Sequence, residues 1–251
     1  MILTYHSLDT SGSVISVSPP AFRRHMEALA RRGIQAVTLA ELAEAWENGG
    51  PLTERPVVLT FDDGFLNVAE HAAPVLSRLG FRATIFAVSG HCGGHNDWPS
   101  QSPQVPRMPL LSFPQLRDLA SAGFEIGSHG CRHAPLDRVS PAEAETEIAG
   151  SRRALEDGLG GAVTSFAYPY GRADAASRAL VRTHYRAACS TELAAAGVWE
   201  DRHFLSRVDV YYVRPPALFE RLDSAAGRAY LSARGLGRRL RRRFAADGAG
   251  T

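Results

Sequence analysis

The sequence predicts an α/β fold in which helices surround a parallel sheet, and three observations support this. Short apolar runs alternate with longer helical patterns, with a repeat of about 30 residues, as in βαβ units. The helical patterns open at a capping residue and close near Gly. Polar residues gather where the apolar runs end, which is where α/β folds keep their active sites.

Seven strands are expected, each a short apolar or β-branched run. They cover residues 2–5, 57–61, 83–88, 124–127, 164–167, 187–190 and 204–208. Helices are expected over residues 19–32, 39–49, 67–79, 113–122, 141–159 and 174–184. Thr38 with Glu41 forms a capping box before the second helix, and Ser140 with Glu143 opens the long fifth one.

The composition is that of a folded globular protein, with 251 residues, 45% hydrophobic and 22% charged. This length suits one barrel-type domain or two small ones, and it excludes a disordered or fibrous class. Three widely spaced cysteines give no disulfide framework. We see neither a signal peptide nor a membrane span, so we expect a cytoplasmic protein, with the inner membrane face as an alternative location.

The C-terminal region differs from the rest in charge. Residues 217–245 have a helical pattern, and residues 224–251 hold seven arginines against one acid, Asp247. We therefore divide the chain into a catalytic domain, residues 1–223, and a basic tail, residues 224–251. The tail is expected to be a solvated, frayed end; the alternative is a basic amphipathic segment that touches anionic lipid or a polyanionic substrate.

Two adjacent carboxylates, Asp62 and Asp63, follow the apolar run 57–61 directly. Because successive side chains diverge at the end of a strand, one acid can bind a cation while its neighbour faces a substrate. The alternative for an isolated pair of this kind is a helix N-cap with a companion acid.

Two histidines, His129 and His133, follow the predicted strand 124–127. Their four-residue spacing lets both rings reach one metal if the segment makes a turn, although many such pairs are surface histidines. With one carboxylate from the preceding motif they make a three-ligand set. Such a set leaves positions open for water and substrate, which is typical of a catalytic metal site.

A third strand end reads Phe-Ala-Tyr-Pro-Tyr-Gly over residues 166–171. Pro169 fixes the backbone, and an exposed amide beside it could bind a developing oxyanion. The rings of Tyr168 and Tyr170 could stack on a sugar. A simple Pro-aromatic turn is the alternative.

In this order and spacing, TFDDG at 60–64, SHxxxH at 128–133 and FAYPYG at 166–171 resemble the first three motifs of the polysaccharide deacetylases, carbohydrate esterase family 4. The third motif resembles the FAYPYG branch. The resemblance spans about residues 1–215 and implies a distorted (β/α) barrel with about seven parallel strands. It also implies removal of the N-acetyl group from an N-acetylated sugar, with release of acetate and no nucleic-acid partner.

The resemblance assigns roles to individual residues. Asp62 would be the general base, while Asp63, His129 and His133 would hold a divalent cation, most often Zn²⁺, with Co²⁺ or Ni²⁺ as alternatives. The backbone N–H of Tyr170 would stabilise the oxyanion.

Two positions depart from the family pattern. Ala167 stands where many members have an arginine that orients the base, so another group must orient Asp62. A Leu-x-His motif usually supplies the general acid, but this region contains Arg207, which cannot act as an ordinary acid and is expected to bind substrate. His6 is the favoured general acid because it ends a strand; His184 and His203 are the alternatives.

Residues 89–111 are rich in Gly, Pro, Ser and His and form a connection long enough to be a functional lid. Trp98 within it could stack on a sugar ring. The alternative is a second metal site built from the histidines and acid of this loop.

Two other functions stay open at the level of sequence. One is an amidase or deformylase that acts on a non-polymeric substrate with the same metal site. The other is a carbohydrate-binding protein that has lost catalysis, since two family elements are missing.

Overall fold

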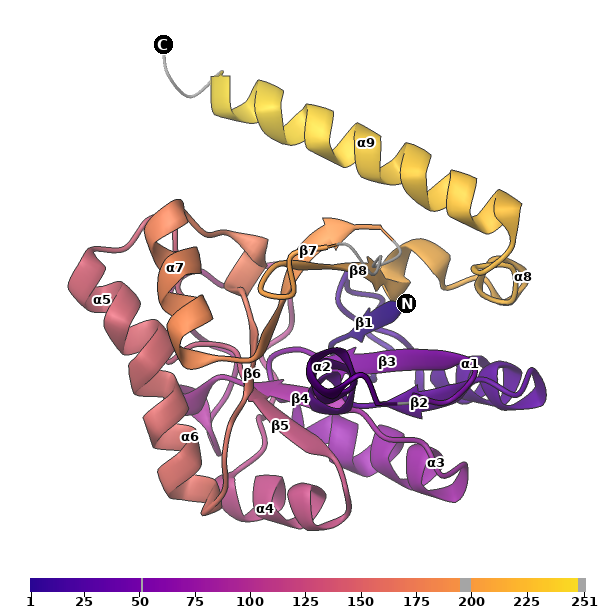
Figure 1. The fold of residues 1–251 in the computed structure, drawn as a ribbon, viewed down its shortest axis with the longest axis horizontal. Coiled ribbons are helices and arrows are strands. Elements are labelled where there is room, and N and C mark those ends of the chain that lie inside the picture. Colours follow the sequence, from indigo (N-terminus) through magenta and orange to yellow (C-terminus); the bar gives the residue numbers. More distant parts are fainter. Residues whose placement is uncertain (51, 195–199, 248–251) are drawn as a thin grey trace.

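The computed structural model describes residues 1–50, 52–194 and 200–247 (Figure 1). Among these residues, seven parallel strands close into a barrel in the order β1-β8-β7-β6-β5-β4-β3, and β3 pairs back with β1. The strands are β1 (Ile2–Tyr5), β3 (Pro56–Phe61), β4 (Thr84–Ala87), β5 (Glu125–Ser128), β6 (Ser165–Ala167), β7 (Ala187–Leu193) and β8 (Leu205–Asp209). This confirms the predicted seven-stranded barrel. A short eighth strand, β2 (Gln35–Val37), pairs with the beginning of β3.

The helices lie around the outside of the strands (Figure 1). They are α1 (Pro19–Arg31), α2 (Leu39–Asn48), α3 (Ala73–Arg78), α4 (Phe113–Ser121), α5 (Pro141–Glu145), α6 (Ser151–Leu159), α7 (Ala175–His184), α8 (Pro216–Phe219) and α9 (Ala225–Asp247). A π-helical turn precedes α3, and a second one, η3 (Thr146–Gly150), joins α5 to α6. The capping boxes at Thr38 and Ser140 form as predicted. None of the described helices is long and apolar enough to cross a lipid bilayer.

The C-terminal region differs from the sequence prediction. The single helical stretch expected over 217–245 is divided into α8 and α9, and α9 continues through Asp247. The strand β2 was not predicted because three residues are too few to give a periodic signal.

The alternation of side chains along β3 separates two cores. Leu59 and Phe61 pack in the larger cluster between the barrel and its helices, whereas Val58 belongs to a smaller cluster with residues of six other strands. Both faces of the strand are therefore covered, which explains its unbroken apolar sequence. Because side chains alternate with a period of two, Thr60 and then Asp62 continue on the side of Val58.

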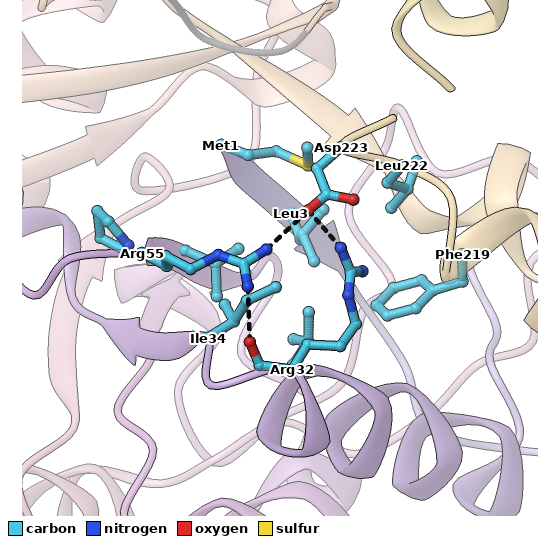
Figure 2. Close-up of a pocket in the computed structure, with 11 residues that line it drawn as sticks. Met1, Leu3, Arg32, Ile34, Arg55, Phe219, Leu222 and Asp223 are labelled. Carbon is cyan, nitrogen blue, oxygen red and sulfur yellow. Dashed lines mark hydrogen bonds and ion pairs between the residues drawn. The ribbon is translucent and has the colours of Figure 1, made fainter. Parts of the chain in front are cut away.

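A pocket of about 260 Å³ opens at the start of β1 and β3 (Figure 2). Its floor is apolar, and at its edge the guanidinium groups of Arg32 and Arg55 both contact the carboxylate of Asp223. Leu222 also lines this pocket. The segment that leads into α9 is thus attached at the end of the barrel where the strands begin.

His25 on α1 is buried in its neutral form. Its Nε2 lies 3.2 Å from the carbonyl of Arg214, which can only accept, so its Nδ1 accepts from the Tyr5 hydroxyl 3.2 Å away. The ring also stacks on Phe219 at 3.9 Å between centroids. Burial lowers the pKa of His25 from 6.5 to about 4.

This depressed pKa predicts a loss of stability in mild acid. The unfolded chain binds the His25 proton near pH 6.5 and the folded protein only near pH 4, so stability falls as the pH is lowered through this window. We expect His25 to contribute a loss of about 3 kcal/mol in the free energy of unfolding. Urea denaturation at pH 7 and pH 4 should show a smaller loss for His25→Gln than for the wild-type protein. Equal losses would contradict the assignment.

Candidate active site

Three strand ends bring the predicted site residues together at one end of the barrel. Asp62 and Asp63 follow β3, His129 and His133 follow β5, and Tyr170 lies in the turn after β6. Since all strands of the ring are parallel, their carboxyl ends meet at the same edge.

Asp63, His129 and His133 converge on one point. Oδ1 of Asp63 lies 3.5 Å from Nε2 of His129 and 3.3 Å from Nε2 of His133, and the two Nε2 atoms are 3.2 Å apart. All three side chains are buried. They are the set of His, Cys, Asp and Glu side chains within the described residues whose ligand atoms are close enough to share a metal ion.

The ligand atoms fit a divalent cation. In a tetrahedral zinc site with bonds of about 2.1 Å, ligand atoms lie about 3.4 Å apart, close to all three observed separations. Oδ1 of Asp63 is also buried without a hydrogen-bond partner, which is costly unless something else binds it.

The backbone at these residues is held in an unusual conformation. Within the described part of the chain, the non-glycine residues with positive φ are Asp63 at 72°, His133 at 58° and Tyr170 at 58°. This left-handed region is disfavoured for residues with a Cβ, and such residues concentrate at functional sites. The fold therefore keeps backbone strain at two of the three metal-ligand candidates, Asp63 and His133, and at Tyr170 in the third motif.

His129 is oriented for metal binding by its second ring nitrogen. Its Nδ1 lies 2.8 Å from the carbonyl oxygen of Ala167, so Nδ1 carries the hydrogen and Nε2 presents a lone pair toward Asp63. Burial lowers the pKa of His129 to about 4, and the nearby carboxylates only partly oppose this. The ring is thus neutral at pH 7, as a metal ligand must be.

Glu147, which sequence reasoning missed, shapes the loop between the two histidines. Its fully buried carboxylate accepts hydrogen bonds from the backbone N–H groups of Cys131 and Arg132, both at 2.9 Å, and from Nε of Arg132 at 2.9 Å. A Cβ at Gly130 would come within 2.8 Å of this carboxylate. No sequence pattern indicates this role, because Glu147 lies inside a helical pattern 14 residues after His133.

Arg207 lies against Asp62 and not in a substrate-binding position, which corrects the sequence prediction. It is 2% exposed, and its Nη1 and Nη2 donate to the two carboxylate oxygens of Asp62 at 2.6 and 2.7 Å. The guanidinium also donates to Thr60 and to the carbonyl of Ser190. Arg207 therefore orients the carboxylate of Asp62, a contact that Ala167 cannot make.

This pairing determines the ionisation of Asp62. Burial alone would raise its pKa, but the charge and hydrogen bonds of Arg207 outweigh burial and hold the pKa well below the usual range for an aspartate. Asp62 is therefore a carboxylate at neutral pH.

The three candidate acids lie in different places. Nε2 of His6 is 3.8 Å from Oδ2 of Asp62, and its side chain is 23% exposed. His203 contacts Tyr185 and Asp201 through its ring, and His184 ends α7; both precede the amino-terminal ends of strands, at the opposite side of the barrel. The structure thus brings only His6, of these three, to the site.

The loop over residues 89–111 packs onto the cluster. The ring of Trp98 lies 4.3 Å from the ring of His133, and Ser100 accepts from the Tyr170 hydroxyl and donates to the His133 carbonyl. Trp98 is 2% exposed, so its ring covers a metal-ligand candidate, which contradicts its predicted stacking on a sugar. Within the described residues, the histidines of this loop join no second metal cluster.

Tyr168 is also placed differently from the prediction. Its ring is fully buried against Phe166 and Phe204, and its hydroxyl donates to the carbonyl of His203. Because Phe166 and Tyr168 are two residues apart at a strand end, they face the same side, toward the outer core. A substrate cannot stack on this ring.

Comparison with known proteins shows which family the sequence matches. A family model described as polysaccharide deacetylase matches residues 49–188. The chain is 30% identical over 210 residues to YxkH of Bacillus subtilis strain 168, which is assigned to the polysaccharide deacetylases, with 83% of this chain and 70% of YxkH covered. It is 28% identical over 137 residues to the poly-β-1,6-N-acetyl-D-glucosamine N-deacetylase of Escherichia coli K12, covering 51% of this chain and 20% of that protein.

A solved structure shows the same fold. The deacetylase PplD of Streptococcus pyogenes superposes with a TM-score of 0.72 at 22% identity, covering 83% of this chain and 90% of PplD.

Removing one member of the convergent set should remove the cation. We expect the wild-type protein to bind one Zn²⁺, Co²⁺ or Ni²⁺ per chain, and His129→Ala to bind it at least about 100-fold more weakly. Titration calorimetry and elemental analysis measure both quantities. His91→Ala, in the covering loop, is the matched control and should bind normally. Equal metal content in the wild-type and His129→Ala proteins would place the cation elsewhere.

Removing the carboxylate that holds the loop between His129 and His133 should weaken metal binding, although no metal-ligand candidate is changed. Glu147→Ala leaves two backbone N–H groups without their acceptor, so we expect about 10- to 100-fold weaker metal binding. Glu145→Ala, at an exposed position two residues earlier at the end of α5, is the control. An unchanged affinity in Glu147→Ala would show that the loop holds its shape without this carboxylate.

Proposed function

The chain belongs to the polysaccharide deacetylase family, and from this premise we propose that it removes the N-acetyl group from an N-acetylhexosamine in a saccharide or glycoconjugate. The single observation that supports this best is the convergence of Asp63, His129 and His133 beside an ionised Asp62. The named substrate of the Escherichia coli relative supports an N-acetylglucosamine unit.

In this proposal Asp62 takes the proton from the attacking water. Each of its oxygens has a second lone pair, so the two bonds from Arg207 leave it able to accept. Arg207 fixes the direction of the carboxylate, and burial keeps competing water away. A divalent cation held by Asp63, His129 and His133, with zinc as our first choice, would polarise the acetamide carbonyl and acidify water.

We assign to His6 the protonation of the departing amine. It is close enough to Asp62 to share one reaction centre, and its side chain is partly exposed. A histidine can hold and release a proton near neutral pH, which Arg207 cannot. The backbone N–H of Tyr170 is assigned to the developing oxyanion, and the ring of Tyr170 lies 4.5 Å from that of His133 between centroids.

The two alternatives explain less. A protein that has lost catalysis need not keep a base. Here Arg207 stands in for the missing family arginine and donates to both carboxylate oxygens of Asp62. An amidase or deformylase could use the same groups, and the identity of the released acid separates it from a deacetylase.

Acetate release tests the function. With N-acetylglucosamine oligosaccharides and the added cation, the wild-type protein should release acetate and yield free amines, whereas Asp62→Asn should lose about 10²- to 10⁴-fold in kcat/KM. Asp62→Asn should still bind the metal, because Asp62 is not among the ligands. Asp157→Asn, at an exposed site on α6, is the matched control.

His6→Gln provides a second arm of this experiment. Its defect should shrink on an acetylated substrate with a better leaving group, because such a group needs no proton from the enzyme. Activity of Asp62→Asn equal to wild type would refute the assigned base. Release of formate from an N-formylated amine, with no acetate released from the acetylated oligosaccharides, would favour the deformylase.

A further inference from the structure

The sequence of α9 is strongly basic. It contains seven arginines and one acidic residue, which gives a formal net charge of +6 over a single helix. The arginines are Arg228, Arg234, Arg238, Arg239, Arg241, Arg242 and Arg243.

Arg214, which follows the 3₁₀ turn Val210–Val213 after β8, and two arginines of α9 lie over tyrosine rings. Arg214 lies 4.3 Å from the ring centre of Tyr211, and Arg234 and Arg238 lie 5.4 and 5.3 Å from that of Tyr212. Tyr230 joins them, since it accepts from Arg234 and donates to the Tyr212 carbonyl. We call these residues the tyrosine–arginine cluster: Tyr211, Tyr212, Tyr230, Arg214, Arg234 and Arg238.

The positive charge of this cluster is not neutralised within the described residues. The described groups that contact the arginines of the cluster are tyrosine rings, a hydroxyl and a carbonyl. Elsewhere many arginines are paired with acids, as Arg172 is with Asp137 and Arg178 with Asp201. The cluster can therefore bind an external anion.

The cluster lies at the active-site end of the barrel. α9 starts beside the carbonyls of Arg221 and Leu222, near the pocket where β1 and β3 begin (Figure 2), and by Gly235 it has reached Leu193 at the end of β7. The helix thus runs in the direction of the strands and extends away from the body (Figure 1). Tyr211 and Tyr212 directly follow β8, whose Asp209 pairs with Thr4, two residues before His6.

Exposed apolar side chains accompany the charge. Leu236 is 55% exposed and Tyr211 36%. In the sequence, Leu240 and Phe244 follow Leu236 at four-residue intervals. A soluble polyanion requires no such apolar residues, whereas a lipid surface binds arginine at its phosphates and accommodates tyrosine and leucine at its interface.

We propose that α9 and the tyrosine–arginine cluster bind an anionic lipid bilayer, with the active-site end of the barrel toward the membrane. On the basis of the proposed function, the substrate is then an acetylated saccharide presented at that surface, such as a glycolipid headgroup.

Vesicle sedimentation tests the membrane contact directly. The full chain should bind vesicles of phosphatidylcholine with phosphatidylglycerol, less so at high salt, and should not bind phosphatidylcholine alone. Replacing both Arg234 and Arg238 by Gln should weaken binding about 30-fold, since each arginine near an anionic surface contributes about 1 kcal/mol. The control replaces Arg23 and Arg24, exposed on α1, by Gln and should bind as wild type.

Three results would overturn the membrane contact: equal binding to both kinds of vesicle, equal losses in the two double variants, or binding of polyphosphate without binding of vesicles.

A second measurement tests the orientation. The Arg234/Arg238 variant should deacetylate a soluble acetylated oligosaccharide at the wild-type rate but lose about 30-fold on the same headgroup displayed in anionic vesicles. Equal rates of the two proteins on the vesicles would refute the orientation. Absence of deacetylation by either protein, with vesicle binding intact, would refute the proposed function and leave the membrane contact standing.

Discussion

Closure of the barrel is the constraint on which the site depends. Seven parallel strands end at one rim, so residues separated by many tens of positions in the sequence meet there. Asp63 and His133 come within 3.3 Å only because β3, β4 and β5 pair in register. The chain keeps a left-handed backbone at both residues, and the surrounding barrel must stabilise that strain.

Buried charge is balanced around this rim by specific partners. Arg207 compensates Asp62 through two short hydrogen bonds, and Glu147 is matched by backbone N–H groups and Arg132. An isolated buried charge would be strongly destabilising, so each of these pairs makes an ionised site compatible with a folded core. By contrast, Oδ1 of Asp63 has no hydrogen-bond partner, which is the feature that a bound cation explains.

The sequence predicted the strands and the convergent ligands well, because apolar periodicity locates strand ends and polar residues follow them. It placed Arg207 incorrectly, since the contact with Asp62 spans 145 residues and depends on a neighbour across the barrel. Tyr168 could have been assigned to the core from its two-residue spacing to the apolar Phe166. The burial of Trp98 depends on how a long loop folds back, for which local sequence carries no signal.

The most direct test of the account is the position of the cation. A crystal of the full chain grown with Zn²⁺ should show, in diffraction recorded at the zinc absorption edge, one anomalous peak about 2.0 to 2.2 Å from Oδ1 of Asp63 and Nε2 of both His129 and His133. Asp62 should remain paired with Arg207 and outside the coordination shell. A peak bound elsewhere, or one coordinated by Asp62 in place of Asp63, would contradict the account.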